Sequence, residues 1–468
     1  MNESEKKIDA KLIFSIIAAG IMSFSGVVVE TAMNVTFPTL MEEFGIGTST
    51  VQWITTGYLL ILAMIIPASS YLKKRFTLKK LFVTAICLFL IGTIMAAVTP
   101  VFSLLLLGRL IQGVGTGIAL PLMFNIVLEQ VPAKKLGLMM GIASLITAMA
   151  PAVGPSVGGM LVSNFGWRMI FISLIPLLLL SFFLGVFSIR QVTETEKISF
   201  QWLDYFFLAA GFACFIFATS TASDAGWISV QVLGLLAASI ICIVIFCLRC
   251  KKSETPLIDI RVFRCVPFSL SVLVLVFIQF ICLGLGFLIP NYAQLVLGEE
   301  AFLAGCLLLP GCIIGAVLSP ISGRMLDRFG AKKPILSGNF CIILATVCFS
   351  IFALKLNIGT FILFYIFFAF GQGFSVGNTM TNGLKQLPPE LNPDGNAVIN
   401  TLQQLAGAIG TSIITTIVAA SQAKLPDDMA AATAQGTQYS FYLLAVLAVV
   451  VICCSLGVFA LSGKKKQA

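Results

Sequence analysis

The sequence predicts an all-α protein that crosses a lipid bilayer many times, and three observations lead to this prediction. Of the 468 residues, 58% are hydrophobic and only 10% are charged, whereas soluble proteins carry about 25% charged residues. The apolar residues occur in runs of about 20, the length an α-helix needs to cross ~30 Å of hydrocarbon. Lysines and arginines gather in alternate loops between these runs, as they do in membrane proteins whose cytoplasmic loops are positively charged.

Fourteen apolar runs are bounded by charge, glycine or proline, and each is predicted to be a membrane helix. In chain order we expect them at 12–37, 51–72, 80–98, 102–128, 137–161, 168–189, 205–221, 230–249, 267–290, 302–322, 334–354, 358–384, 397–420 and 438–461. With the N-terminus in the cytoplasm, 25 of the 29 lysines and arginines fall on the cytoplasmic side. Both termini are therefore expected there. The net charge of +9 indicates topology rather than affinity for nucleic acid.

The composition also excludes several classes of chemistry. The chain contains no histidine, so Ser-His-Asp catalysis, HExxH zinc sites and histidine proton relays are excluded. The 13 cysteines are scattered through apolar runs without the spacing of a disulfide framework, and the one CxxC, Cys247 to Cys250, lacks the second pair or histidine of a metal site. No phosphate-binding GxxxxGK[ST] loop occurs. We therefore expect no enzyme, no metal and no cofactor, with an ion gradient as the energy source.

A loop sequence occurs twice and indicates two related halves. The clearer copy, GRMLDRFGAKK at 323–333, follows the tenth run, and SYLKKRFTLKK at 70–80 follows the second. The first copy has Lys74 where the second has Asp327, and Thr77 where the second has a glycine.

Two apolar runs are rich in small residues. The fourth contains LLLGRLIQGVGTG at 105–117, with Arg109 inside the span, and the fifth contains GIASLITAMAPAVGPSVGG at 141–159. Glycines allow helix backbones to approach closely, and Pro155 removes one helical hydrogen bond and favours a bend.

These segments resemble the major facilitator superfamily. The repeated loop is similar to that superfamily's GxLaDrxGrk signature, 105–117 to its drug-exporter motif, and 141–159 to the motif associated with antiporters. The sequence ETAMNVTFP at 30–38, together with QWITTGY at 52–58, resembles the fourteen-helix drug:proton antiporter family and its lincomycin-resistance-type branch. The likeness covers nearly the whole chain.

The resemblance implies a major facilitator fold. Two six-helix bundles are expected at 1–189 and 265–468, with two inserted helices and their linkers at 190–264. The motifs imply gating or conformational roles for Gly154, Pro155, Gly158, Gly159, Gly323, Asp327, Arg328 and Gly330.

Glu30 is predicted to be the single buried acid, because the other 19 acids fall in loops or at helix ends. A charge near mid-membrane costs at least ~2.5 to 3.5 kcal/mol, so it needs a function and a partner. Glu30 and Arg109 lie at similar distances from the expected outer ends of their helices, so both are expected about 10 Å below the external surface. We expect them to form the proton-coupling pair.

Two interpretations of this pair remain open. Burial favours the neutral form of a carboxyl group and a nearby arginine favours the charged form, so a change in the surroundings of Glu30 can bind or release a proton. Alternatively, the two residues form a static ion pair that fixes two helices.

Polar and aromatic residues inside the apolar runs are candidate substrate ligands. An amide in a membrane helix more often hydrogen-bonds a neighbouring helix than a ligand. The candidates are Ser23, Asn34, Trp53, Tyr58, Gln112, Thr116, Gln279, Tyr292, Asn378 and Gln404, and further amides of this kind are Asn291, Asn382, Asn400 and Gln403.

The sequence therefore predicts a secondary active efflux transporter of the bacterial cytoplasmic membrane, which exports amphipathic or cationic compounds in exchange for protons. We expect it to act as a monomer and without nucleic acid. One alternative is a dedicated proton-coupled exporter of one endogenous metabolite, lipid or signalling molecule. Another is a membrane sensor or scaffold, which would need no buried acid–base pair.

Overall fold

The computed structural model describes residues 8–46, 48–51, 53–196, 199–253, 256–425 and 427–464. Within these ranges the regular structure is helical, and fourteen helices are long and apolar enough to cross a membrane. The predicted all-α class and the number of membrane helices are confirmed.

Six long helices form the N-terminal bundle, and an inserted pair follows. The bundle contains α1 (Ala10–Ala32), α4 (Trp53–Arg75), α5 (Leu78–Val98), α6 (Phe102–Gln130), α7 (Leu136–Phe165) and α8 (Arg168–Ser188). The inserted pair is α9 (Trp202–Ala225) and α10 (Val230–Lys252). Short helices α2 (Phe37–Phe44) and α3 (Thr48–Val51) join α1 to α4.

The C-terminal bundle repeats this plan with six long helices. They are α11 (Val266–Leu295), α13 (Leu309–Phe329), α14 (Lys332–Phe352), α15 (Ile358–Leu384), α16 (Asn392–Lys424) and α17 (Met429–Lys464). The short helix α12 (Ala301–Cys306) precedes α13. One hydrophobic core lies within the C-terminal bundle, and a larger one runs from the N-terminal bundle through the inserted pair into the adjoining ends of α11, α15 and α16.

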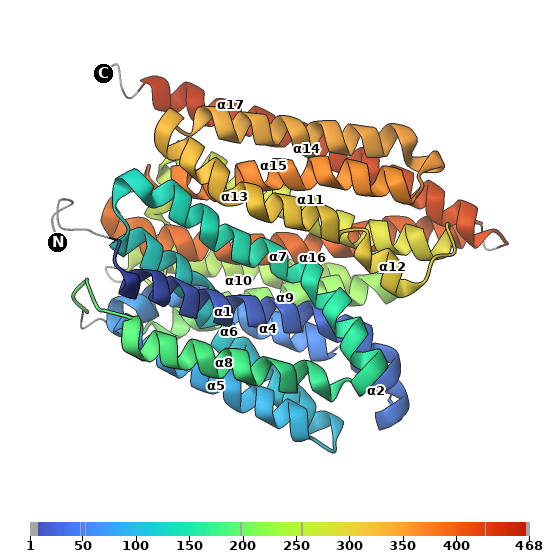
Figure 1. Cartoon of the computed structure of the whole chain (residues 1–468), viewed down its shortest axis with the longest axis horizontal. Coiled ribbons are helices and arrows are strands. Elements are labelled where there is room, and N and C mark those ends of the chain that lie inside the picture. Colours follow the sequence, from blue (N-terminus) through green and yellow to red (C-terminus); the bar gives the residue numbers. More distant parts are fainter. Residues whose placement is uncertain are drawn as a thin grey trace.

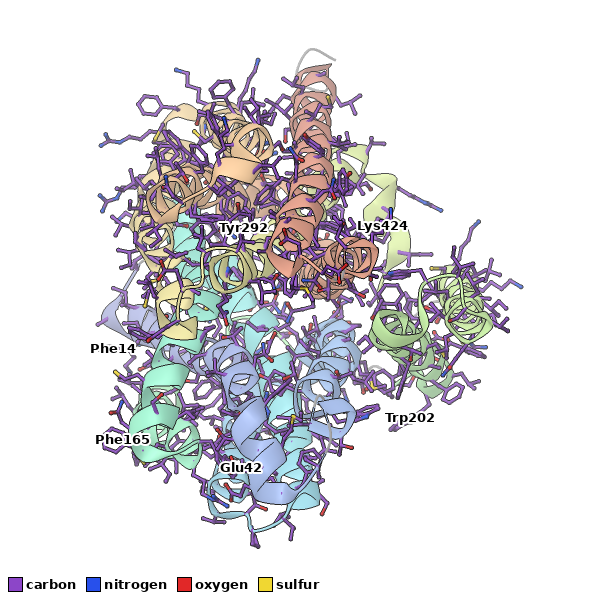
Figure 2. The ribbon with its side chains drawn as sticks, turned by 90° about the vertical axis from the view of Figure 1, so that its right-hand side faces the viewer. Phe14, Glu42, Phe165, Trp202, Tyr292 and Lys424 are labelled. Atoms are coloured by element: carbon purple, nitrogen blue, oxygen red, sulfur yellow. The ribbon has the colours of Figure 1, made fainter. Side chains whose placement is uncertain are left out.

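The long helices lie side by side, and the start of α1 and the end of α17 lie at the same end of the molecule, which we call the termini end (Figure 1). Figure 2, a view along the helices, shows the inserted pair with Trp202 at the side of the two bundles. The inserted pair contacts both bundles. The Phe217 ring of α9 packs at a tilt against Trp53 of α4, with 5.1 Å between the ring centres, and Trp227 donates a hydrogen bond to Thr416 of α16 at 2.8 Å.

Two expected helices are interrupted near proline. The predicted single helix at 302–322 is two helices, because the chain leaves the helix at Leu307 and Leu308 before Pro310. Proline has no N–H group and disfavours helix in the residue before it. The first membrane helix similarly continues as a 3₁₀ turn at Met33–Thr36, and α2 then begins at Phe37 with Pro38 in its first turn.

Candidate functional site

A buried cluster forms where α1, α4 and α6 meet. The Arg109 guanidinium is fully buried and lies over the Tyr58 ring, 4.1 Å from the ring centre. Its NH1 group donates to Gln112 Oε1 at 2.8 Å. The Tyr58 hydroxyl donates to the Gly26 carbonyl of α1 at 2.9 Å and lies 2.8 Å from the Thr116 hydroxyl. A side chain at Gly26 would overlap Thr116, so glycine is needed there for the close approach of α1 and α6.

Glu30 completes this cluster without forming an ion pair. Its charge and that of Arg109 interact electrostatically, but no ion pair within 4 Å joins these two described residues. Glu30 Oε2 is buried without a hydrogen-bond partner, and so are Nε and NH2 of Arg109. The cluster therefore holds a carboxylate and a guanidinium with unused hydrogen-bonding capacity, which differs from the geometry of a static ion pair.

The prediction that Glu30 is the single buried acid is wrong. Among the described residues, three acids are less than a tenth exposed, and so are more buried than Glu30, and each is paired with a cation. The pairs are Asp204 with Arg249, Asp259 with Arg261, and Asp394 with Lys74. These acids lie at helix ends, as expected, but the bundles and linkers pack over those ends. Glu30 differs because it lies inside a membrane helix and makes no ion pair.

A central cavity of about 120 Å³ lies between the two bundles. The predicted ligands Gln279 and Gln404 line it, as do the further candidates Asn400 and Gln403. Gln372 also lines it and was missed, although it too is an amide inside an apolar run. Val27 of α1 contributes to the opposite wall. Since Glu30 lies three residues further along α1, the buried cluster is about one helical turn from the cavity.

The remaining candidate ligands of the N-terminal bundle lie outside the cavity wall. Tyr58, Gln112 and Thr116 belong to the buried cluster, as described above. Ser23 is fully buried, and its Oγ has no hydrogen-bond partner among the described residues. Asn34 is exposed and accepts a hydrogen bond from Thr55 at 3.1 Å. Trp53 packs on the inserted pair.

Two candidates of the C-terminal bundle stabilise helix packing. Tyr292 is buried with its ring 5.2 Å from that of Phe361. Asn378 is buried and donates to the Ser322 hydroxyl of α13 at 3.1 Å.

The glycine-rich motif of α7 packs on the helix that carries Glu30. Added side chains at Gly154 and Gly158 would overlap Thr31 and Ala32 of α1. Gly159, by contrast, faces Val35 at an ordinary contact distance. Since Thr31 and Ala32 follow Glu30 directly, a movement of α7 at these glycines would change the surroundings of the Glu30 carboxyl.

The second copy of the repeated loop connects the bundles at the termini end. Asp327 of α13 accepts hydrogen bonds from the backbone N–H groups of Gly137 and Leu138, at 2.9 and 3.0 Å, in the first turn of α7. A helix N-terminus attracts negative charge. Gly323 lies directly against the Gly137 backbone, where a side chain would overlap it.

The other two motif residues, Arg328 and Gly330, take no part in this contact. Arg328 is exposed, and Gly330 ends α13 with φ +79°. Positive φ is unfavourable for other residues, so this turn favours glycine.

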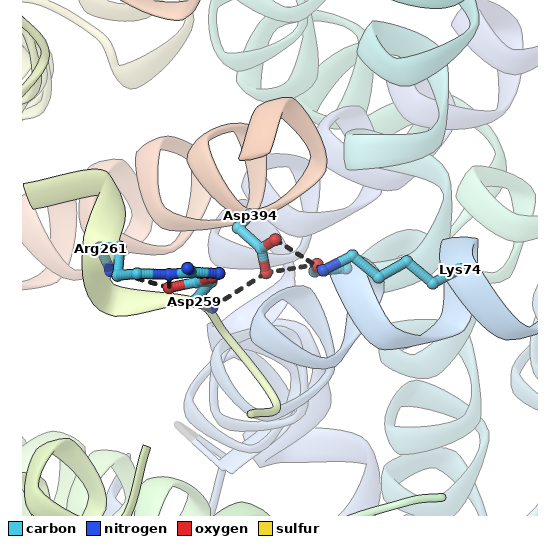
Figure 3. Close-up of polar contacts among 5 residues, drawn as sticks. Lys74, Asp259, Arg261 and Asp394 are labelled. Carbon is cyan, nitrogen blue, oxygen red and sulfur yellow. Dashed lines mark hydrogen bonds and ion pairs between the residues drawn. The ribbon is translucent and has the colours of Figure 1, made fainter. Parts of the chain in front are cut away.

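The first copy makes a corresponding contact with the charges reversed (Figure 3). Lys74 of α4 lies 2.7 Å from Asp394 in the first turn of α16. Ser70 donates to the same carboxylate at 2.6 Å, and the backbone N–H of Asp259 donates to it at 3.1 Å. Asp259 belongs to the linker that follows α10, so this contact joins both bundles and the inserted pair.

Two repeated helical bundles around a central cavity, joined by matching contacts at one end, define a transporter built from two related halves. The chain belongs to the Major Facilitator Superfamily, whose family model matches residues 19–411, and within it to the lincomycin-resistance-type branch. It is a multi-pass membrane transporter of small molecules and not an enzyme.

The comparisons with known proteins agree on this assignment. The chain is 37% identical to the lincomycin resistance protein LmrB of Listeria monocytogenes, over 94% of this chain and 96% of that protein. It is 35% identical to LmrB of Bacillus subtilis, over 94% of this chain and 93% of that protein. A proton:xylose symporter structure, XylE, has the same fold with a TM-score of 0.66 at 16% identity, covering 95% of each chain. The human organic anion transporter MFSD10 matches with a TM-score of 0.66 at 12% identity, over 94% of this chain and 100% of that one.

Proposed function

We propose that this protein exports amphipathic or cationic compounds from a bacterial cell in exchange for protons. The main support for this proposal is the position of Glu30. It is a carboxyl group inside a membrane helix, with one oxygen buried and unpartnered, about one turn from the cavity between the bundles. The names of relatives that are resistance proteins support export of drugs.

The coupling follows from the surroundings of this carboxyl group. When the cavity is dry, desolvation favours protonated Glu30, and when water enters, the charge of Arg109 favours the deprotonated form. A conformational change that exposes Glu30 alternately to each side would therefore carry a proton in one direction and substrate in the other. No cofactor takes part in this cycle, and the monomer contains all of its parts.

The positive loops favour an orientation with both termini in the cytoplasm. The contacts of Asp327 and Asp394 lie at the termini end, where Asn396 of α16 also donates to Asn125 of α6 at 2.8 Å. In this orientation the structure is closed toward the cytoplasm. The central cavity then belongs to an outward-facing or occluded step of alternating access.

Everted membrane vesicles test the proposal. Vesicles that contain the protein and pump protons inward are exposed to chemically diverse amphiphiles, and the pH gradient is followed with a fluorescent dye. We expect some compounds to collapse the gradient in these vesicles but not in vesicles without the protein. A gradient unaffected by all compounds, while labelled compounds still accumulate, would contradict proton coupling.

A dedicated exporter of one endogenous solute would use the same machinery. The same screen distinguishes it, because a dedicated exporter responds to one chemical class and a multidrug exporter to several.

A further inference from the structure

The central cavity has two chemically different walls. The C-terminal bundle supplies all of its side-chain carboxamides: Gln279, Gln372, Asn400, Gln403 and Gln404. The wall from the N-terminal bundle is mainly apolar. Its residues are Val27, Leu120, Phe124 and Pro151, with the hydroxyl groups of Ser144 and Thr147.

The described residues that line this cavity include no Asp, Glu, Lys or Arg. Glu30, about one turn beyond Val27, is not part of the wall. A cation in the cavity would therefore have no carboxylate in direct contact. Removing a charge from water without a partner is far more costly than removing a hydroxyl or amide group that finds a hydrogen bond.

Several polar groups of the wall are available to a ligand. The half-buried side chains of Gln279, Gln403 and Gln404 make no hydrogen bond to another residue that the structure describes. Gln372 donates to the Cys282 sulfur at 3.2 Å, which is a weak acceptor. On the opposite wall, Ser144 is only 6% exposed, and its Oγ has no partner within the described ranges.

We propose that this cavity binds uncharged amphipathic solutes rich in hydroxyl or amide groups. Their polar side faces the carboxamides of the C-terminal bundle, and their apolar side packs against Val27, Leu120 and Phe124. A carboxamide both donates and accepts hydrogen bonds, so a group of them matches hydroxyls and amides. Solutes without such groups would leave these polar side chains unpaired. The inference rests on the proposed function and narrows its substrate class to neutral compounds.

Two probes with the same apolar part and different heads test this inference. Benzyl β-D-glucopyranoside is neutral and rich in hydroxyls, whereas benzyltrimethylammonium is a cation without donors. Binding of each to the full chain in lipid nanodiscs is measured by calorimetry. Occupancy of the cavity is measured by the maleimide reaction of Cys282 and Cys312, which line it. We expect the glucoside to bind at least tenfold more tightly and to slow labelling of both cysteines.

Variants show what each wall of the cavity contributes to binding. Gln403→Leu and Gln404→Leu should each weaken glucoside binding by about fivefold or more, because one hydrogen bond is lost, and should leave benzyltrimethylammonium binding nearly unchanged. Phe124→Ala should weaken both probes by the same factor. Gln294→Leu is the matched control, because Gln294 is exposed at the end of α11, outside the cavity.

Equal or tighter binding of the ammonium probe would overturn the inference, and so would glucoside binding that does not respond to Gln403→Leu and Gln404→Leu. The affinity ratio in the unchanged protein tests it even if a variant fails to fold. Glucoside binding with these variant effects, but no compound that moves protons in vesicles, would contradict the proposed antiport and support the cavity assignment. Proton-coupled export of a cation that competes for the cavity would support the proposed antiport and contradict the cavity assignment.

Discussion

The ammonium group of Lys74 lies 2.7 Å from the carboxylate of Asp394, and this ion pair joins the two bundles at the termini end. The related contact of the second half has Asp327 at the first turn of α7. In both places a carboxylate lies at a helix N-terminus, where the helix dipole favours negative charge. In the contact of the second loop copy the carboxylate belongs to the loop motif itself, as Asp327. In the contact of the first copy it belongs to the helix that the motif touches, as Asp394 of α16. Both contacts thus place a carboxylate at a helix N-terminus, although the residue comes from opposite partners.

Asp394→Asn should weaken the closed state at the termini end. Lys74 would lose its partner, and removal of one member of a fully buried ion pair costs about 3 to 5 kcal/mol. Because the Lys74 side chain is 25% exposed and keeps contact with water, we expect a cost at or below about 3 kcal/mol. Hydrogen–deuterium exchange of the full-length protein should show faster exchange in the first turns of α16 and the last turn of α4.

The exchanged pair Lys74→Asp with Asp394→Lys separates charge attraction from the helix dipole. It restores the attraction but places a cation at the N-terminus of α16, so we expect only partial recovery of slow exchange. Full recovery would show that the dipole is unimportant here. No change in exchange in Asp394→Asn would contradict a role for this ion pair in closure.

Arg109→Ala should abolish transport and raise the pH midpoint of substrate binding by about one unit, because the charge that favours deprotonated Glu30 is gone. Arg109→Lys should rescue only partly, since lysine keeps the charge but not the planar group that lies over Tyr58. Binding is measured across pH, with Lys424→Ala, an exposed residue at the end of α16, as the control (Figure 2). Identical pH profiles for Arg109→Ala and the unchanged protein would refute the coupling of the two residues.

Glu43 should make stability depend on pH in the acidic range. Burial raises the pKa of this carboxyl, but hydrogen bonds from Trp167 (2.6 Å) and Arg168 outweigh that effect and hold the pKa below its ordinary value of 4.5. A lowered pKa stabilises the folded state above pH 4.5, and this stabilisation is lost as the pH falls through the folded-state value.

Because the Glu43 side chain is 37% exposed, the effect should be under about 1 kcal/mol. Thermal unfolding in detergent between pH 7 and pH 3 should show a smaller decrease in Tm for Glu43→Gln than for the unchanged protein. Parallel Tm curves would contradict this role.

Export of a neutral solute in exchange for one proton should move one charge per cycle. The membrane potential then adds about 2.3 kcal/mol per 100 mV to the driving force. In everted vesicles at equal pH, a valinomycin-imposed potential, interior positive, should drive accumulation of the neutral substrate. Export of a monovalent cation should not respond to this potential. A neutral substrate indifferent to the potential would contradict one proton per cycle, and a cation driven by it would require a second proton site.

Most of the fold could be predicted from the sequence, because the length of the apolar runs determines where the membrane helices form. Helical rise predicts similar depths for Glu30 and Arg109, but only the packing of α1 on α6 shows that their helices are neighbours. The interruption before α13 was missed although Pro310 signals it, because hydropathy does not register a local change of backbone direction.

The tertiary partners of polar residues could not be predicted. Asp394 is separated from Lys74 by 320 positions, and only the packing of α16 on α4 brings them together. The sequence does not reveal which of its many amides face the cavity. Asn378 and Gln404 are both amides inside apolar runs, and only the orientation of each helix about its axis decides that Gln404 lines the cavity and Asn378 does not. Tyr58 could be named as a candidate, but its position over Arg109 depends on the packing of α4 on α6.

If Glu30 is the group that exchanges a proton for substrate, substrate binding should release a proton from it. The purified protein in weakly buffered solution is titrated with the compound that gives the largest response in everted vesicles, and the released protons are counted across pH. We expect a maximum of about one proton per bound substrate, and none from Glu30→Gln that still binds substrate. Equal proton release from Glu30→Gln and the unchanged protein would contradict this role of Glu30.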